Sequence, residues 1–204
     1  MFRNSLRRDM IARRMALPAA RHAALSAAVR DRLAAVFSEL AGDGSGNKSG
    51  NKSGNSSGNG SGQVVGFCWP VQNEPDLRPF IAGLIAAGCR AVLPVVLRPG
   101  VPLAFREWWP EQPLVPDRYG IPTPTDGDFL HPAILLLPVN AFDAGNHRLG
   151  YGGGFFDRTL AALAPRPLAI GVGFDFQRVA SIRPAAHDLP LDAVVTESGC
   201  QRIR

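Results

Sequence analysis

Residues 134–172 read ILLLPVNAFDAGNHRLGYGGGFFDRTLAALAPRPLAIGV, and this stretch contains the pattern that decides the fold. Residues 134–137 and 168–172 are short, continuous apolar runs, which are typical of strands buried on both faces of a sheet. The apolar spacing of residues 155–163 predicts a helix between them. A strand, a helix and a second strand in this order indicate that the two strands pair in parallel.

The same order of elements occurs earlier in the chain. An apolar run at 64–69 predicts a strand, a helical face follows at 77–85, and residues 91–96 predict a second strand. The sequence therefore predicts an α/β fold with three layers, α/β/α, and a mostly parallel sheet. In such sheets, ligands bind beyond the carboxyl ends of the strands.

Further elements are expected at both ends of the chain. Phe2, Leu6 and Met10 recur every four residues, which predicts an amphipathic helix over residues 3–17. A second helical pattern follows Pro18 and continues to about residue 40. Residues 103–106 are expected to form a short edge strand, and residues 193–196 a last short strand.

The length and composition favour a single domain over residues 1–204. The chain has 204 residues, of which 46% are hydrophobic, so it can bury an ordinary core. Residues 42–62 contain only Gly, Asn, Ser, Lys and Asp, and they repeat a unit that resembles GNKS. We interpret this segment as a flexible insertion between the second helix and the first strand, without a chemical role.

The cysteines and the hydropathy pattern limit the location of the protein. Cys68, Cys89 and Cys200 are odd in number and lack metal-ligand spacing, so disulfides and zinc are not expected. The apolar stretches are far shorter than the roughly 20 residues of a membrane span. We therefore expect a cytoplasmic protein that binds no membrane, and we expect a monomer.

The positive charge is concentrated at the start of the chain. Of the formal net charge of +5, residues 1–17 contribute five arginines against one aspartate. This fits a phosphate-bearing ligand at least as well as nucleic acid, and a solvated arginine-rich helix face is the alternative. The aromatic content of 8% counts against nucleic-acid binding, so we expect none.

The glycine cluster at residues 150–154 predicts a phosphate-binding loop. Several backbone N–H groups could converge there, and the helix that follows adds its positive N-terminal end. Arg148 could add charge-assisted hydrogen bonds, and Asp157 could hold a magnesium ion that bridges phosphate oxygens. The spacing matches neither a P-loop nor a dinucleotide fingerprint. The alternative is a tight structural turn with Asp157 as an exposed helix charge.

The longer stretch AFDAGNHRLGYGGGFFDRTL, residues 141–160, resembles the signature of the 5-formyltetrahydrofolate cyclo-ligases, also called 5,10-methenyltetrahydrofolate synthetases. The resemblance extends to RNSLR at 3–7, FCWPVQNEPD at 67–76, YGIPTP at 119–124 and AAHDLPLDAVVT at 185–196. It covers nearly the whole chain apart from the insertion.

The resemblance implies an ATP- and magnesium-dependent ligase of folate one-carbon metabolism that closes 5-formyltetrahydrofolate to 5,10-methenyltetrahydrofolate. It implies that Arg148 and Tyr151 are catalytic and that Asp157 and Asp188 bind the metal ion. It implies folate contacts from Trp69, Glu74, Tyr151, Gly152, Gly153, Gly154 and Phe155. It implies ATP contacts from Arg3, Arg7, Arg148, Leu149, Gly150, Tyr151, Gly152, Gly153, Gly154, Phe155 and Phe156.

Four residues depart from the family pattern. Arg3 stands where lysine is usual, Asn146 where glycine is, Thr123 where many relatives carry glutamate, and Phe156 where a second tyrosine is found. Because these changes affect the substrate side, a relative that uses ATP on another substrate is one alternative function. A non-catalytic protein that binds nucleotide or RNA is another. Without the resemblance, Trp69 could equally be a core residue and Glu74 a helix N-terminal charge.

Overall fold

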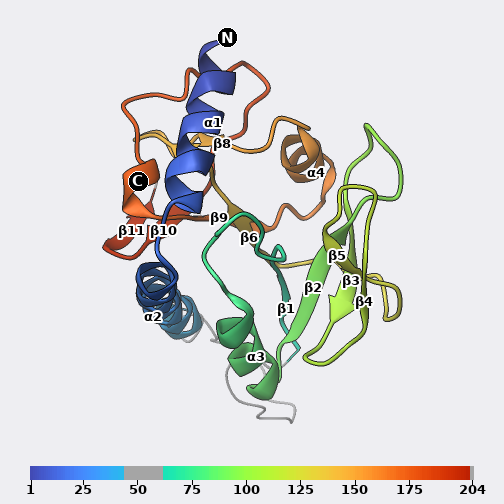
Figure 1. Ribbon diagram of the computed structural model, residues 1–204. Helices are drawn as coiled ribbons and strands as arrows, with labels where there is room; N and C mark the ends of the chain where they lie inside the picture. The colour runs from blue at the N-terminus through green and yellow to red at the C-terminus, as the bar shows by residue number, and fades with distance from the viewer. Residues whose placement is uncertain (44–61, 203–204) are drawn as a thin grey trace.

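The computed structural model describes residues 1–43 and 62–202 (Figure 1). Its main element is a mixed seven-stranded sheet with the order β11-β10-β9-β6-β1-β2-β3. The five central strands β10, β9, β6, β1 and β2 are parallel to one another, and the antiparallel strands β11 and β3 lie at the two edges. The strands are β1 (Val64–Gly66), β2 (Arg90–Val95), β3 (Ala104–Trp108), β6 (Ile134–Pro138), β9 (Leu168–Val172), β10 (Ala193–Thr196) and β11 (Gly199–Arg202). The predicted, mostly parallel sheet is confirmed.

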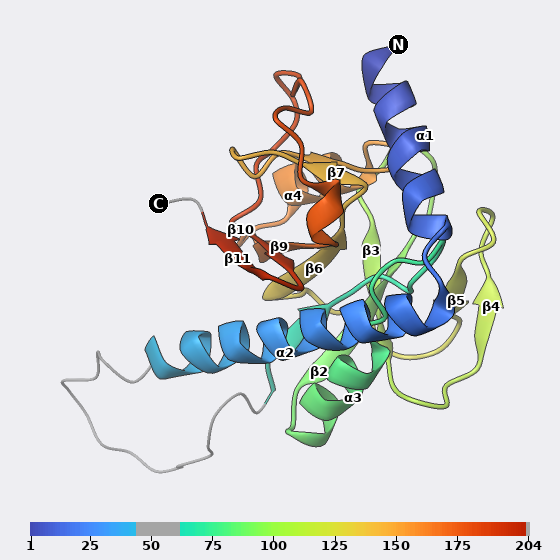
Figure 2. The ribbon, with the colours of Figure 1, turned by 60° about the vertical axis from the view of Figure 1, so that its left-hand side comes forward.

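Helices cover both faces of this sheet, as the three-layer prediction requires (Figures 1 and 2). The helices α2 and α3 pack on one face and α4 packs on the other, while α1 lies above the carboxyl ends of the strands. The helices are α1 (Phe2–Met15), α2 (Ala19–Asp43), α3 (Arg78–Ala86) and α4 (Phe155–Ala162), with a short 3₁₀ helix at Asp175–Gln177.

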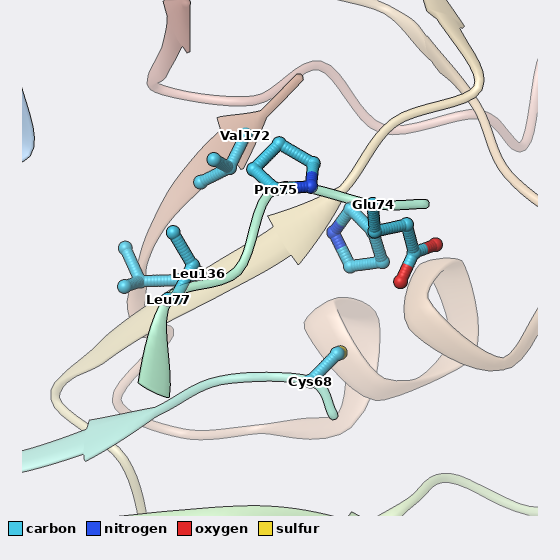
Figure 3. Close-up of a pocket in the computed structure, with 7 residues that line it drawn as sticks. Cys68, Glu74, Pro75, Leu77, Leu136 and Val172 are labelled. Carbon is cyan, nitrogen blue, oxygen red and sulfur yellow. The ribbon is translucent and has the colours of Figure 1, made fainter. Parts of the chain in front are cut away.

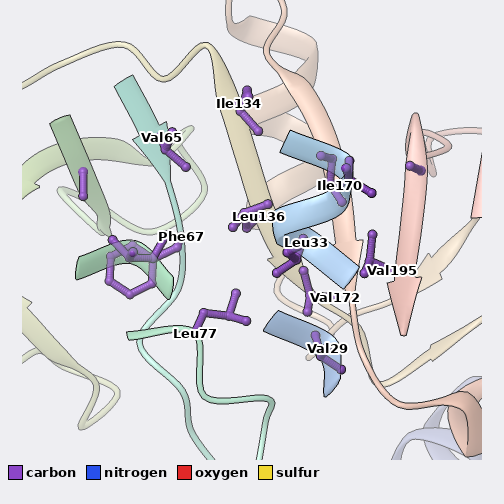
Figure 4. Close-up of a cluster of buried hydrophobic side chains, with 14 of the residues drawn as sticks. Val29, Leu33, Val65, Phe67, Leu77, Ile134, Leu136, Ile170, Val172 and Val195 are labelled. Carbon is purple, nitrogen blue, oxygen red and sulfur yellow. The ribbon is translucent and has the colours of Figure 1, made fainter. Parts of the chain in front are cut away.

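Alternation along β6 shows how the two faces are filled. Leu136 lies in the cluster that contains Val29 and Leu33 of α2 (Figure 4). The next residue, Leu137, lies in the cluster on the opposite face, with Leu160 of α4. Because successive side chains of a strand point to opposite faces, a continuous apolar run is what a sheet covered on both sides needs.

The direction of chain winding changes between β1 and β6, which are neighbours in the sheet. From β1 the chain moves to β2 and β3 on one side, and from β6 it moves to β9, β10 and β11 on the other. The segments that follow β1 and β6 therefore separate at the carboxyl edge of the sheet. This is the place where open α/β sheets bind ligands.

Several expected elements differ in extent. The strand expected at 64–69 ends at Gly66, and the expected last strand, β10, is followed by β11. Two small hairpins were not predicted, because strands of two or three residues are too short to show a period. They pair β4 (Leu114–Pro116) with β5 (Pro122–Pro124) and β7 (Ala141–Phe142) with β8 (Arg148–Leu149).

The expected insertion at 42–62 lies mostly outside the described residues. Its first two residues, Gly42 and Asp43, belong to the end of α2 instead, so the helix is slightly longer than its apolar pattern indicates. In the described part of the chain, no helix combines the length and the apolar character needed to cross a membrane.

Candidate active site

The glycine loop at residues 150–154 connects the β7–β8 hairpin to α4. Asp143 anchors this hairpin, because its Oδ1 accepts hydrogen bonds from the N–H groups of Gly145 and His147, at 3.1 and 3.2 Å. Asn146, at the tip, has a φ of +58°, in the left-handed region that asparagine tolerates better than most residues. The asparagine that replaces the usual glycine is therefore compatible with the turn.

Two of the loop glycines have backbone conformations that L side chains rarely adopt. Gly152 has a φ of +95°, and Gly154, directly before α4, has a φ of +63°. A Cβ atom on Gly152 would also lie 3.2 Å from Nη2 of Arg7. Backbone conformation and the approach of an arginine therefore both favour glycine at position 152.

The main chain of the loop uses its carbonyl groups within the protein and leaves its N–H groups available. Gly150 O accepts a hydrogen bond from Arg7 Nε at 2.6 Å, and Gly153 O accepts one from Arg158 Nη2 at 2.7 Å. The backbone N–H groups of residues 150–154 donate to no residue that the structure describes. An anion could therefore bind these donors without displacing a protein acceptor.

Two arginines of α1 lie close to each other near this loop, and one of them contacts it. Arg7 contacts Gly150 O, and Arg3 forms two hydrogen bonds to the Asp188 carboxylate, at 2.6 and 3.1 Å. Burial and the charge of Arg3 lower the pKa of Arg7. Two cations held close together attract a shared anionic ligand, so the expected grouping of Arg3 and Arg7 on one face agrees with the structure.

Arg148 and Asp157 form an ion pair beneath the loop. Arg148 Nη2 donates to Asp157 Oδ1 at 3.1 Å, and the side chains are 4% and 20% exposed. Burial lowers the pKa of Arg148, whereas the nearby charges of Asp157 and Asp188 act in the opposite direction. Phe156 lies against the same guanidinium, with its ring centroid 5.9 Å from Arg148 Cζ.

The two candidate metal ligands, Asp157 and Asp188, differ in how many hydrogen bonds their carboxylates already accept. Asp157 uses Oδ1 for Arg148, whereas Asp188 accepts from Arg3 with both oxygens and from the N–H of Ala185 with Oδ2. The described residues contain no group of three or more potential metal-ligating side chains. Magnesium is commonly held by one or two carboxylates together with phosphate oxygens, so Asp157 fits such a site and Asp188 would first have to release Arg3.

Glu74 lies at the end of the segment that follows β1. Its side chain is almost fully buried, Oε1 accepts a 2.5 Å hydrogen bond from the Tyr151 hydroxyl, and Oε2 accepts from the N–H of Val71 at 3.1 Å. Burial raises the pKa of Glu74, and the charge of Arg14 partly opposes this rise. Burial and the charge of Glu74 also raise the pKa of Tyr151. The structure therefore joins two predicted folate contacts, Glu74 and Tyr151.

Other predicted residues lie around this centre in different settings. Trp69 is half-buried beside Trp108, and the Arg78 guanidinium lies 5.0 Å from its ring centroid. The Leu149 side chain is buried in a cluster with Met10, so it supports the loop from within. Thr123 is buried in β5, where its hydroxyl donates to Ile121 O at 3.0 Å.

Two residues near the site were not predicted from the sequence. The exposed ring of Tyr119 packs edge-on against Phe155, with centroids 5.9 Å apart. Arg14 is completely buried and contacts the Tyr151 hydroxyl at 2.8 Å. The helical period could have indicated Arg14, because residues 3, 7, 10 and 14 share one face of a helix.

A small cavity lies directly behind Glu74 (Figure 3). It has a volume of about 10 Å³, enough for one water molecule and far too small for a nucleotide or a folate. Figure 3 shows the Glu74 carboxylate directed away from the apolar side chains of this cavity. Larger ligands would therefore bind on the exposed side of the glycine loop. The cavity is lined by Cys68, Glu74, Pro75, Leu77, Leu136, Pro138 and Val172.

Comparisons with known proteins agree on one family. The model of the 5-formyltetrahydrofolate cyclo-ligase family matches residues 55–197. A 5-formyltetrahydrofolate cyclo-ligase of Escherichia coli K12 is 38% identical over 134 residues, covering 62% of this chain and 73% of its own length. The namesake protein of Mycolicibacterium smegmatis is 32% identical over 139 residues, covering 62% and 70%.

Solved structures show the same fold. The NMR structure of Aquifex aeolicus 5,10-methenyltetrahydrofolate synthetase is 26% identical, covers 100% of this chain and 94% of its own, and superposes with a TM-score of 0.77. A 5,10-methenyltetrahydrofolate synthetase from Mycoplasma pneumoniae, 20% identical, covers 97% and 99% with a TM-score of 0.71. The second similarity supports the fold alone.

Proposed function

The chain belongs to the 5-formyltetrahydrofolate cyclo-ligase family, and from this membership we propose that it closes 5-formyltetrahydrofolate to 5,10-methenyltetrahydrofolate with ATP, releasing ADP and phosphate. One observation of the site supports this proposal most directly. The N–H groups of residues 150–154 have no acceptor in the described part of the chain, Arg7 binds Gly150 O, and Arg3 is close enough for its charge to lower the pKa of Arg7. Unpartnered donors next to two cations form a suitable site for a triphosphate.

The reaction places few chemical demands on protein side chains. The formyl oxygen attacks the γ-phosphorus of ATP, and ADP leaves. The neighbouring anilino nitrogen then attacks the activated carbon, loses its proton, and phosphate departs from that carbon. No covalent bond to the enzyme is needed, so the protein contributes orientation and charge neutralisation.

On the nucleotide side, Arg3, Arg7, Arg148 and the loop amides would bind the phosphates. The loop would also bring the reacting phosphate close to the formyl oxygen. Asp157 would hold the magnesium ion, which neutralises phosphate charge when bound. Asp188 would contribute after Arg3 turns from it towards a phosphate, because the same guanidinium cannot serve both fully.

On the folate side, Trp69 and Glu74 would contact the substrate together with residues 151–155. Tyr151 is exposed along its ring while its hydroxyl is bound to Glu74, so the ring has a fixed orientation towards a ligand. Arg148 and Tyr151 would act as the catalytic residues: Arg148 from the phosphate side and Tyr151 from the folate side.

The test is a direct assay of the purified protein. With ATP, magnesium and 5-formyltetrahydrofolate, it should produce the near-ultraviolet absorbance of the methenyl product, and ADP should form in equal amount. ATP turnover stimulated only by another metabolite would identify a relative with a different substrate. Salt-sensitive RNA binding without ATP turnover would instead indicate a binding protein. Either of these two results would reject the proposed reaction.

The remaining expectations are independent of this assay. We propose a cytoplasmic monomer that binds neither nucleic acid nor membrane and that forms one domain over residues 1–204. Size-exclusion chromatography with light scattering would test the oligomeric state, and fractionation of cells would test the location.

A further inference from the structure

The buried residue Arg14 connects three segments around the site. Its side chain is 0% exposed, although it comes from the amphipathic helix α1. Nε donates to Gln72 O at 2.7 Å, and Nη2 donates to the Tyr151 hydroxyl at 2.8 Å. A longer contact of 3.5 Å joins Nη1 to Val139 O, after β6. One guanidinium therefore contacts the segment after β1, the segment after β6 and the glycine loop.

The turn at residues 71–74 depends on these contacts. Gln72 and Asn73 have φ values of +50° and +56°, in the left-handed region, which asparagine tolerates better than most residues but which is unfavourable for glutamine. Arg14 binds Gln72 O with its side chain, and its own carbonyl oxygen accepts a hydrogen bond from Asn73 Nδ2 at 3.3 Å. The contacts with Arg14 therefore offset part of the conformational cost of the turn that carries Glu74.

Arg14 is also the counter-charge of Glu74. Its Nη2 lies 3.8 Å from Glu74 Oε1, and both side chains are almost fully buried. The other titratable groups near this carboxylate are Tyr151, Cys68 and His22, whose Nε2 lies 2.9 Å from Glu74 O. Two buried charges are costly unless they are paired, so removing one of them leaves the other in an unfavourable state.

We propose that Arg14 is a positioning residue that holds the Glu74 turn and the Tyr151 hydroxyl in register, and so sets the folate-binding side of the site. The part of this inference that concerns folate rests on the proposed function. The part that concerns the contacts of Arg14 with the Glu74 turn and Tyr151 does not. Arg14 contacts Tyr151, which is assigned to both ligands, but none of the residues assigned to ATP alone, in contrast to Arg7 of the same helix, which binds Gly150 O. Its loss should therefore affect folate more than ATP.

The loss of Arg14 also has a predicted effect on pH dependence. Burial already raises the pKa of Glu74, and the positive charge of Arg14 lowers it. Without that charge, the carboxylate becomes protonated at a higher pH. The acidic limb of the pH–activity profile should therefore move towards alkaline pH in Arg14→Met. In Arg14→Lys, which keeps the positive charge, the acidic limb should lie close to that of the wild type.

The kinetic experiment compares Arg14→Met and Arg14→Lys with a matched control, Arg13→Met, at an exposed neighbouring position of α1. We expect the KM for the folate to rise roughly tenfold or more in both Arg14 variants, and the KM for ATP to change less than about twofold. Arg13→Met should change neither constant. Equal effects on both substrates, or an acidic limb that stays in place in Arg14→Met, would overturn the proposal.

A second measurement needs no activity and so separates this inference from the proposed function. Urea unfolding of the wild type, Arg14→Met, Glu74→Gln and the double variant forms a double-mutant cycle, in which each single change removes one of the two charges. We expect the two changes to be non-additive by a factor of about ten in the unfolding equilibrium constant. Additive effects would show that the two residues act independently and would overturn the structural part. If Arg14→Met does not fold, the comparison of the two KM values in Arg14→Lys still tests the proposal.

Discussion

The Tyr151 hydroxyl donates a 2.5 Å hydrogen bond to Glu74 Oε1, although 77 positions separate the two residues in the chain. Glu74 belongs to the segment after β1, and Tyr151 to the loop that leads into α4. Because β1 and β6 are neighbours in the sheet, the segments that follow them start side by side at its carboxyl edge. This hydrogen bond therefore joins the two halves of the candidate site.

The glycine at position 152 can be tested by adding one methyl group. Gly152→Ala should destabilise the protein by about 1–2 kcal/mol, because its φ is +95° and the new Cβ would approach Arg7. We also expect a higher KM for ATP, since the backbone strain and the contact with Arg7 would both displace the N–H groups of the loop. Gly83→Ala in α3, where a Cβ meets nothing within 4 Å, is the control and should leave the activity unchanged. An unaltered KM for ATP in Gly152→Ala would argue against phosphate binding by this loop.

Arg7 and Arg8 allow a comparison of two adjacent cations on α1. Arg7 reaches Gly150 O, whereas Arg8 is exposed. Arg7→Ala should raise the KM for ATP roughly tenfold or more, because charge-assisted hydrogen bonds to phosphate are among the stronger ones. Arg8→Ala should have little effect at physiological salt. If both variants weakened ATP binding equally, a general electrostatic attraction would explain the result better than a specific contact.

Asp157 can be tested for a role in magnesium binding by titration. Asp157→Asn keeps the acceptor for Arg148 but removes the negative charge. The turnover should fall roughly tenfold or more, and the magnesium concentration for half-maximal activity should rise. The control is Asp192→Asn, which loses an aspartate paired with Arg166 beside the amino ends of β9 and β10. A normal magnesium dependence in Asp157→Asn would exclude Asp157 as a ligand.

The Arg3–Asp188 pair predicts a pH-dependent contribution to stability. Burial raises the pKa of Asp188, but the hydrogen bonds from Arg3 and Ala185 outweigh it, and the pKa lies below its ordinary value of 3.8. A lowered folded-state pKa means that the contribution is present above about pH 4 and is lost as the pH falls through the lowered value. Urea unfolding should therefore show a larger difference between the wild type and Asp188→Asn at pH 6 than at pH 3.

The control for this comparison is Asp31→Asn, at an exposed position of α2. Its difference from the wild type should be the same at both pH values. The assignment of the stabilising pair would be wrong if Asp188→Asn differed from the wild type equally at pH 6 and pH 3.

The layers of the fold could be predicted because they depend on local patterns. The apolar runs at 134–137 and 168–172 became β6 and β9, and the spacing at 155–163 became α4. The strand β11 gave no such signal, because Gly199, Cys200, Gln201 and Arg202 are not an apolar run. It forms at an edge, where pairing with β10 is sufficient.

The site was predicted less completely, because burial is a property of the tertiary structure. Arg3 and Arg7 were identified, and the structure brings Arg7 to the glycine loop and Arg3 to Asp188. Arg14, on the same face, was not identified as a separate residue, since a buried arginine is rare and its partners are distant in the chain. The fully occupied carboxylate of Asp188 could not be predicted either, because it depends on how α1 lies above the loop.

The placement of α1 has a consequence for how the two substrates influence each other. In the proposed assignment, this single helix would supply Arg3 and Arg7 to the ATP subsite and would support the folate subsite through Arg14. Any displacement of the helix would therefore weaken both subsites together. Binding of one substrate would hold the helix in place and so favour binding of the other. Such linkage is reciprocal, so the factor by which ATP changes folate affinity must equal the factor by which folate changes ATP affinity.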